Sequence, residues 1–81
     1  MLIDVTSVQP LPDYKLGLLF EDGKRGIFDV APLLNQGVFQ KLRDVDTFNQ
    51  ARVEFGTVTW PGNVDIAPET LYDGCKDVSE D

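Results

Sequence analysis

Carboxylates are the most plentiful reactive groups in this 81-residue chain, which has 14 Asp and Glu residues against 7 Lys and Arg. Two carboxylates held in one cleft at different pKa values can perform general acid–base hydrolysis. The candidates are Asp29, Asp44, Asp46, Asp65 and Glu69. Each also fits as a cap or first-turn residue of a short helix, and so small a domain has little room for a deep pocket. We therefore predict that the chain is not an enzyme and has no catalytic residue, and we keep a small carboxylate-dependent hydrolase as the last of three functional hypotheses.

Other catalytic and metal-binding groups are scarce. The chain has no histidine and a single cysteine, Cys75, which excludes imidazole-based triads, intramolecular disulfides and Cys/His zinc sites. We expect Cys75 to be a small buried hydrophobe. Residues 44–46 resemble the start of a calcium-binding loop, but Phe48 and Asn49 stand where a ligand and a glycine belong. The sequence thus predicts no metal and no cofactor.

The net charge is −7, and it is concentrated near the C-terminus. Residues 65–81 hold six acids and one base, which gives −5, whereas residues 1–64 hold eight acids and six bases, which gives −2. An acidic body repels phosphate backbones and anionic lipids, so we expect no membrane partner and no direct nucleic-acid partner. The first residues do not resemble a targeting signal, which predicts a cytoplasmic protein.

The elements that must position these groups begin with an N-terminal strand and a hairpin. Residues 3–8 are rich in β-branched side chains, and Pro10 bars this strand from continuing as a central one. In the next segment apolar side chains alternate with other residues, at Tyr14, Leu16, Leu18 and Phe20. A three-residue loop that ends at Gly23, in the left-handed conformation, pairs Leu16 with Phe28 and puts the large apolar residues on one face.

The same register turns Leu19 and Ile27 toward the opposite face of this hairpin. Lys15, Arg25 and Asp29 frame them, and Lys15 lies opposite Asp29, its partner of opposite charge. An apolar patch with a polar rim is typical of a protein-binding surface. We therefore predict that Leu19 and Ile27 contact a protein partner.

The middle of the chain predicts short helical turns over residues 31–50, followed by a second hairpin over residues 52–60. We place the hairpin turn at Gly56-Thr57, a two-residue turn with glycine first. This register sets Phe55 opposite Val58, with both side chains in the core.

A C-terminal helix is predicted from Pro68 onward. Its apolar side should pack on the sheet, and it consists of Leu71, Cys75 and Val78. Its other side is acidic, and it consists of Glu69, Asp73, Asp77 and Glu80. We predict that the first three of these acids contact a basic protein partner, with a solvated helix face as the alternative. Residues 76–81 are expected to form a frayed acidic tail.

The C-terminal half also carries a run of residues typical of one family. Residues 60–72, Trp-Pro-Gly-Asn-Val-Asp-Ile-Ala-Pro-Glu-Thr-Leu-Tyr, resemble the closing signature of a bacterial family, domain of unknown function 2442. Residues 16–23 are similar to its first hairpin, and residues 29–34 and 39–44 to its middle segment. The signature positions, for which we expect structural roles, are Gly23, Trp60, Pro61, Asp65, Pro68, Glu69, Leu71 and Tyr72. The order Gly62-Asn63 departs from the order expected in that turn.

The resemblance implies a small α+β domain with an antiparallel sheet and no established catalytic residues. It also implies a gene that stands beside that of another short protein, in a family that is sometimes joined to a DNA-binding helix-turn-helix. This arrangement suggests a toxin–antitoxin-like or regulatory pair.

We predict a single α+β domain over residues 1–81. An antiparallel sheet of about five short strands, made of two hairpins and the N-terminal strand, carries short helical turns and a C-terminal helix packed on one face. The leading function is non-enzymatic protein interaction, as an antitoxin-like or regulatory partner of a neighbouring small protein, and a homodimer is compatible with it. The second hypothesis is a nucleic-acid-associated transcriptional regulator that acts through Lys15, Arg25 and Arg52 on one sheet face.

Overall fold

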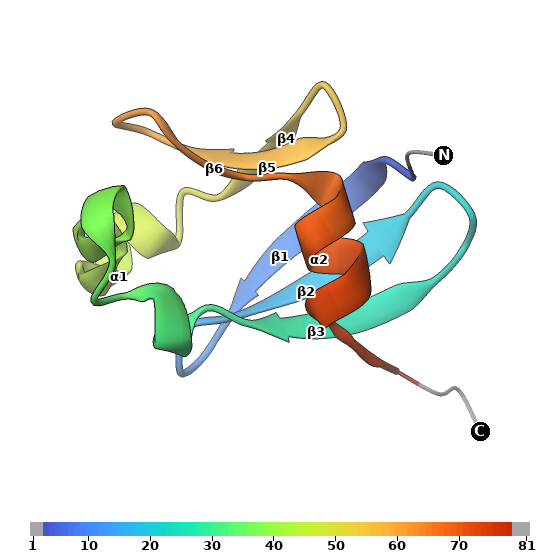
Figure 1. Cartoon of the computed structure of the whole chain (residues 1–81), viewed down its shortest axis with the longest axis horizontal. Coiled ribbons are helices and arrows are strands. Elements are labelled where there is room, and N and C mark those ends of the chain that lie inside the picture. Colours follow the sequence, from blue (N-terminus) through green and yellow to red (C-terminus); the bar gives the residue numbers. More distant parts are fainter. Residues whose placement is uncertain (1–2, 79–81) are drawn as a thin grey trace.

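Two antiparallel sheets and several short helices make up the computed structural model, which describes residues 3–78 (Figure 1). The first sheet has the strand order β1-β2-β3-β7, with β1 at Val5–Leu11, β2 at Lys15–Phe20, β3 at Arg25–Asp29 and β7 at Lys76–Asp77. The second sheet has the order β4-β5-β6, with β4 at Arg52–Glu54, β5 at Thr57–Trp60 and β6 at Val64–Ile66. The helices are the 3₁₀ helices η1 (Ala31–Leu33) and η2 (Gly37–Arg43) and the α-helices α1 (Val45–Phe48) and α2 (Pro68–Gly74).

The α+β class is confirmed, but within residues 3–78 the strands number seven and divide into two sheets rather than forming one sheet of about five. The edges of the first sheet explain the division. Pro10, near the end of the edge strand β1, has no N–H to offer another strand. The opposite edge, along β3, is partly covered by β7. The second sheet instead meets the start of β1, where the Val5 N–H donates to the Gly56 carbonyl at 3.0 Å.

The β2–β3 hairpin has the predicted register. Leu16 lies opposite Phe28, and Lys15 lies opposite Asp29. Gly23 has φ +92°, and the Phe20 N–H donates to the Lys24 carbonyl at 2.9 Å across the three-residue loop. The prediction from the alternating apolar pattern is therefore confirmed, because only this register buries the large side chains of both strands on one face.

The predicted register of the second hairpin is wrong, and the turn lies one residue earlier than predicted. Val53 lies opposite Val58, and Glu54 lies opposite Thr57, so the turn is Phe55-Gly56. These two residues have φ +54° and +77°, as a type I′ turn requires. Alternation cannot separate the two registers, because Val53, Val58 and Ile66 share one face in both. The observed turn also contacts the N-terminal strand, where the Val5 N–H donates to the Gly56 carbonyl at 3.0 Å. Phe55 is consequently fully exposed at the hairpin tip instead of buried.

One core joins both sheets and the helices. Its fully buried large side chains are Phe20, Phe48, Leu16, Leu42, Leu71, Val5, Val30, Val58 and Val64. The Trp60 indole N–H donates to the Phe48 carbonyl at 2.9 Å, and the two rings stack with centroids 6.2 Å apart. The predicted helical turns of residues 31–50 are present as η1, η2 and α1, although Asp44, and not Asp46, caps α1, by accepting a hydrogen bond from the Asp46 N–H at 3.1 Å.

The C-terminal helix begins at Pro68 as predicted but ends at Gly74. Gly74 lies against the Phe28 ring, where an added Cβ would stand 2.8 Å from Cε1. The chain is extended at Cys75, which is half-buried, and β7 then pairs with β3. Residues 76–77 are thus a strand rather than part of the expected frayed tail, and Glu80 of the expected acidic stripe lies outside the described residues.

Candidate protein-docking surface

The first sheet has an inner face, which α2 and the second sheet cover, and an outer face, which they leave open (Figure 1). Side chains alternate between the two faces along each strand. On β2 the inner residues Leu16 and Leu18 are buried, whereas Leu19 on the outer face is only half-buried. Ile27 on β3 shares the outer face and is also half-buried. The structure therefore brings together the two predicted apolar contact residues.

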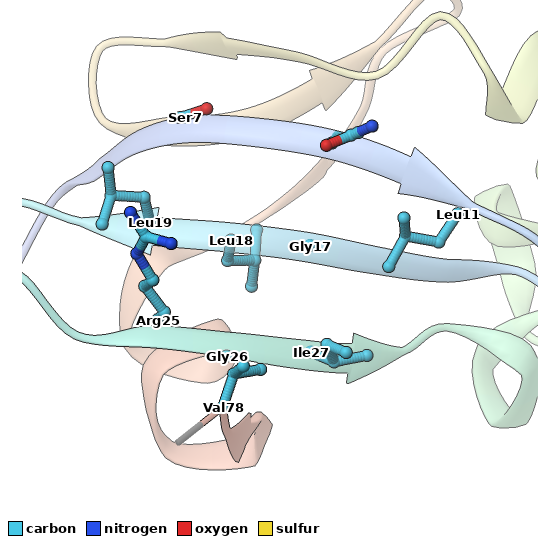
Figure 2. A pocket seen from close by; sticks show the side chains of 10 residues that line it. Ser7, Leu11, Gly17, Leu18, Leu19, Arg25, Gly26, Ile27 and Val78 are labelled. Carbon is cyan, nitrogen blue, oxygen red and sulfur yellow. The ribbon is translucent and has the colours of Figure 1, made fainter. Parts of the chain in front are cut away.

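A hollow of about 370 Å³ lies on this outer face (Figure 2). Its lining includes Leu11, Gly17, Leu19, Arg25, Ile27 and Val78. The hollow forms where the sheet lacks a side chain, because Gly17 stands opposite Ile27 on one neighbouring strand and opposite Gln9 on the other. A Cβ added to Gly17 would meet only the end of the Leu11 side chain, at 3.5 Å, and the backbone carbonyl of Gln9, at 3.7 Å. The space above Gly17 is thus available to a partner.

Basic side chains predominate on the outer face that carries the hollow, although the chain as a whole is acidic. Along the described strands, the charged residues of the outer face are Lys15, Arg25, Asp29 and Lys76. Lys76 stands opposite Ile27, and Arg25 lines the hollow itself. Three bases against one acid give this face a local charge of +2 in a chain of −7. We call Lys15, Arg25 and Lys76 the basic rim.

The predicted acidic contact residues do not join this surface. Glu69 and Asp73 are exposed on α2, which packs against the inner face of the first sheet. Asp77 is on β7 rather than on the helix, and its carboxylate lies 3.4 Å from the Lys24 ammonium. The continuous acidic stripe expected on one helix is therefore wrong, because the helix ends at Gly74, before Asp77.

A polar cluster on the other side of the sheet ties the first hairpin to α2. The Tyr72 hydroxyl donates to Asp22 at 2.6 Å, and Lys24 donates to the Tyr72 carbonyl at 3.0 Å. The Lys24 ammonium also stands 3.9 Å from the Tyr72 ring centroid. The Tyr72 hydroxyl and the Lys24 N–H both donate to Asp22 and lower its pKa, while the same hydroxyl bond raises the pKa of Tyr72. This cluster holds together the turn at Gly23 and the signature residue Tyr72.

The other signature residues also occupy structural positions. Trp60 and Val64 face each other across a three-residue loop in which Gly62 and Asn63 both have positive φ, +89° and +65°. Both residue types adopt this conformation readily, so the order Gly62-Asn63 fits the turn. Pro61 begins the loop, Asp65 is exposed on β6, and buried Pro68 opens α2, with Glu69 in its first turn and Leu71 fully buried.

The carboxylates considered for catalysis are spread over the molecule. Asp29 accepts a hydrogen bond from the Ala31 N–H at 3.0 Å, and Asp44 caps α1. Asp46, Asp65 and Glu69 lie on α1, β6 and α2. Among residues 3–78, no three acidic, cysteine or histidine residues are grouped so that they could hold a metal ion. Burial raises the pKa of the Cys75 thiol, which keeps it in the less reactive protonated form.

The basic face expected for a nucleic-acid regulator is also divided. Lys15 and Arg25 lie on the outer face of the first sheet, whereas Arg52 lies on β4 of the second sheet. The Arg52 guanidinium stands 3.1 Å from the Glu54 carboxylate. The prediction that Lys15, Arg25 and Arg52 share one sheet face is therefore wrong.

Sequence reasoning missed several residues of the outer face and of the hairpin tip. Leu11 and Val78 line the hollow beside Leu19 and Ile27, but Leu11 follows the expected end of its strand and Val78 was assigned to a helix. Phe55 was assigned to the core. Its position directly before a glycine is the signal that could have placed it in a type I′ turn.

The fold and the outer face define a small α+β domain with an open hollow on the outer face of its first sheet. The family model "Protein of unknown function (DUF2442)" matches residues 5–77. The chain therefore belongs to this family, and the resemblance seen in the sequence is confirmed. Comparison with curated proteins and with solved structures gave no match. In the described part of the chain, no helix has the length and apolar character needed to cross a membrane.

Proposed function

We propose that this protein is a non-enzymatic, cytoplasmic interaction module that binds a protein partner on the outer face of its first sheet. The observation that carries the proposal is the hollow over Gly17, lined by Leu11, Leu19 and Ile27 and left open by the fold. Apolar side chains gathered around a hollow with a polar rim are typical of protein-binding surfaces.

The rim specifies the chemistry of the partner. Lys15, Arg25 and Lys76 share the outer face with the hollow, so the complementary surface is an apolar side chain flanked by acidic residues. This replaces the basic partner inferred from Glu69 and Asp73, because those acids lie on the other side of the sheet. A stable interface needs about 800 Å² from each protein, so the partner extends beyond the hollow over neighbouring strands.

The resemblance to the family suggests where to look for this partner. The resemblance implies that such a chain is often encoded beside another short protein, and we propose that the two products form an antitoxin-like or regulatory pair. The module then acts by covering a surface of the neighbouring protein rather than by transforming a substrate.

Filling the hollow tests this proposal. The chain is co-expressed with the product of the adjacent gene, and their affinity is measured by titration calorimetry for wild type and for Gly17→Val. Valine suits a strand, and the nearest atoms to a Cβ at position 17, the movable end of Leu11 and the Gln9 carbonyl, lie at ordinary van der Waals distance. The free energy of unfolding should therefore change by no more than about 0.5 kcal/mol. We expect binding to weaken by roughly tenfold or more.

The double substitution Glu69→Gln and Asp73→Asn is the matched control, because it changes exposed charges on the opposite side of the sheet. It should change the affinity by less than about twofold. Unchanged binding of Gly17→Val, or loss of binding in the control alone, would remove the outer face as the docking surface.

A further inference from the structure

The tip of the β4–β5 hairpin carries an aromatic residue that the fold does not use. Phe55 is fully exposed and has φ +54°, a left-handed conformation that is unusual for a bulky side chain. Asn, Asp or Gly would occupy this position of a type I′ turn with less strain. The chain thus presents a phenyl ring to solvent at a position where folding alone favours another residue, and such an outlier points to a function.

Acidic residues lie near the turn that carries this ring. Glu54 precedes it in the chain, and the side chain of Asp4 packs so closely on Gly56 that a Cβ added there would stand 2.8 Å from the Asp4 Cβ. Asp4 is in turn joined to Glu21, whose carboxylate accepts a hydrogen bond from the Asp4 N–H at 3.1 Å. With Arg52 paired to Glu54, the surroundings of the ring have a net charge of −2. We call Phe55, Asp4, Glu21 and Glu54 the Phe55 tip.

The Phe55 tip and the hollow have complementary chemistry. The tip offers one apolar ring flanked by acids, and the hollow offers about 370 Å³ of largely apolar space within the basic rim. The ring cannot fill the hollow of its own chain, because it is fully exposed in the folded protein. We infer that Phe55 of one copy docks into the hollow of a second copy, above Gly17.

This self-contact rests on the proposed function of the outer face and adds a mode of regulation to it. The docked ring occupies the space that the partner needs, so self-association and partner binding compete. The tip and the hollow are different surfaces, and the contact therefore joins copies head to tail, either closing into a pair or ring or continuing as a chain. One ring in one hollow buries less than a stable interface does, so we expect a dissociation constant on the order of 0.1 mM.

Sedimentation velocity of the full chain, from roughly 10 µM to 1 mM, measures this association. Wild type should shift to larger species as its concentration rises, while Phe55→Ala and Gly17→Val should each remain monomeric. Val45→Ala is the matched control, because Val45 is an exposed apolar side chain on α1 that belongs neither to the lining of the hollow nor to the Phe55 tip, and it should associate as wild type does.

Mixing the two defective variants gives the sharpest test. Phe55→Ala keeps an intact hollow, and Gly17→Val keeps an intact tip, so an equimolar mixture should form a one-to-one heterodimer that neither forms alone. A monomeric wild type, association of Phe55→Ala equal to wild type, loss of association in Val45→Ala, or a mixture without heterodimer would each overturn the self-contact.

Different results would contradict the proposed self-contact and the proposed docking face. If wild type stays monomeric while Gly17→Val loses the product of the adjacent gene, the self-contact is wrong and the docking face remains. If Gly17→Val binds that product as tightly as wild type does, the docking face itself is wrong, whatever the oligomeric state.

Discussion

The two faces of the first sheet use glycine in opposite ways. Gly26 on the inner face is buried where the chain leaves α2, and an added Cβ would overlap the Cys75 thiol and stand 3.1 Å from the Lys76 carbonyl. Gly17 on the outer face has only the end of Leu11 and a backbone carbonyl within 4 Å of such a Cβ, and a hollow opens above it. The inner glycine makes room for the protein's own chain, and the outer one leaves room for another molecule.

This difference separates the residues that hold the fold from those available for binding. The inner side carries the core and the Asp22–Tyr72 cluster, and it places several signature residues in structural roles. The outer face contributes half-buried apolar side chains and bases, and within residues 3–78 no second layer covers them. Substitutions on the two sides should therefore change different observables, namely stability on the inner side and association on the outer one.

The largest expected effect is on the inner face. Gly26→Ala should lower the free energy of unfolding by about 1–3 kcal/mol, because its Cβ forces apart β3 and the Cys75–Lys76 segment. Gly17→Ala should change it by no more than about 0.5 kcal/mol. Urea denaturation of both variants measures the difference, and equal stability of the two would contradict the contrast between the faces.

A smaller effect of opposite sign is expected at the hairpin tip. Phe55→Asn should raise the free energy of unfolding by about 1 kcal/mol, because Asn tolerates the left-handed backbone better than Phe does. The same variant should lose self-association, since it lacks the ring. Thermal unfolding and sedimentation together check both results, and a variant less stable than wild type would show that Phe55 serves the fold.

The smallest effect concerns pH. Tyr72→Phe removes the hydroxyl that lowers the pKa of Asp22 below its ordinary value of 3.8. A lowered carboxyl pKa stabilises the folded state above the ordinary value, and this contribution is lost as pH falls through the folded value. Wild type should therefore exceed Tyr72→Phe in stability near about pH 7, and the gap should narrow below about pH 3.8. A gap independent of pH, measured by urea denaturation, would contradict this coupling between the Tyr72 hydroxyl and the Asp22 carboxylate.

The fold could be predicted from the sequence where the residue pattern allowed only one pairing register. Alternation from Leu16 to Phe20 and a single left-handed glycine left one register for the first hairpin, and with it the shared face of Leu19 and Ile27. The second hairpin was ambiguous, because Phe55 is apolar and either Phe55-Gly56 or Gly56-Thr57 makes an acceptable turn. Alternation does not separate the two turns, because both put Val53 and Val58 on one face, and the contact of Gly56 with the N-terminal strand is not local in the sequence.

The surface could be predicted only in part for a similar reason. Helical spacing placed Asp77 beside Glu69 and Asp73, but contact of Gly74 with Phe28 ends the helix and pairing with β3 takes the next residues. The same pairing brings Lys76 and Val78 to the hollow and makes its rim basic. Long-range contacts of this kind leave no periodic pattern in the sequence. The net positive charge of the outer face of the first sheet could therefore not be predicted.

The most direct test of which side of the first sheet binds the partner is to map the bound surface. Backbone amide chemical shifts of the labelled chain are recorded while the unlabelled product of the adjacent gene is added. We expect the largest changes at Gly17, Leu19 and Ile27, with Glu69 and Asp73 unaffected. Changes centred on Glu69 and Asp73, with the outer face silent, would contradict a docking surface above Gly17.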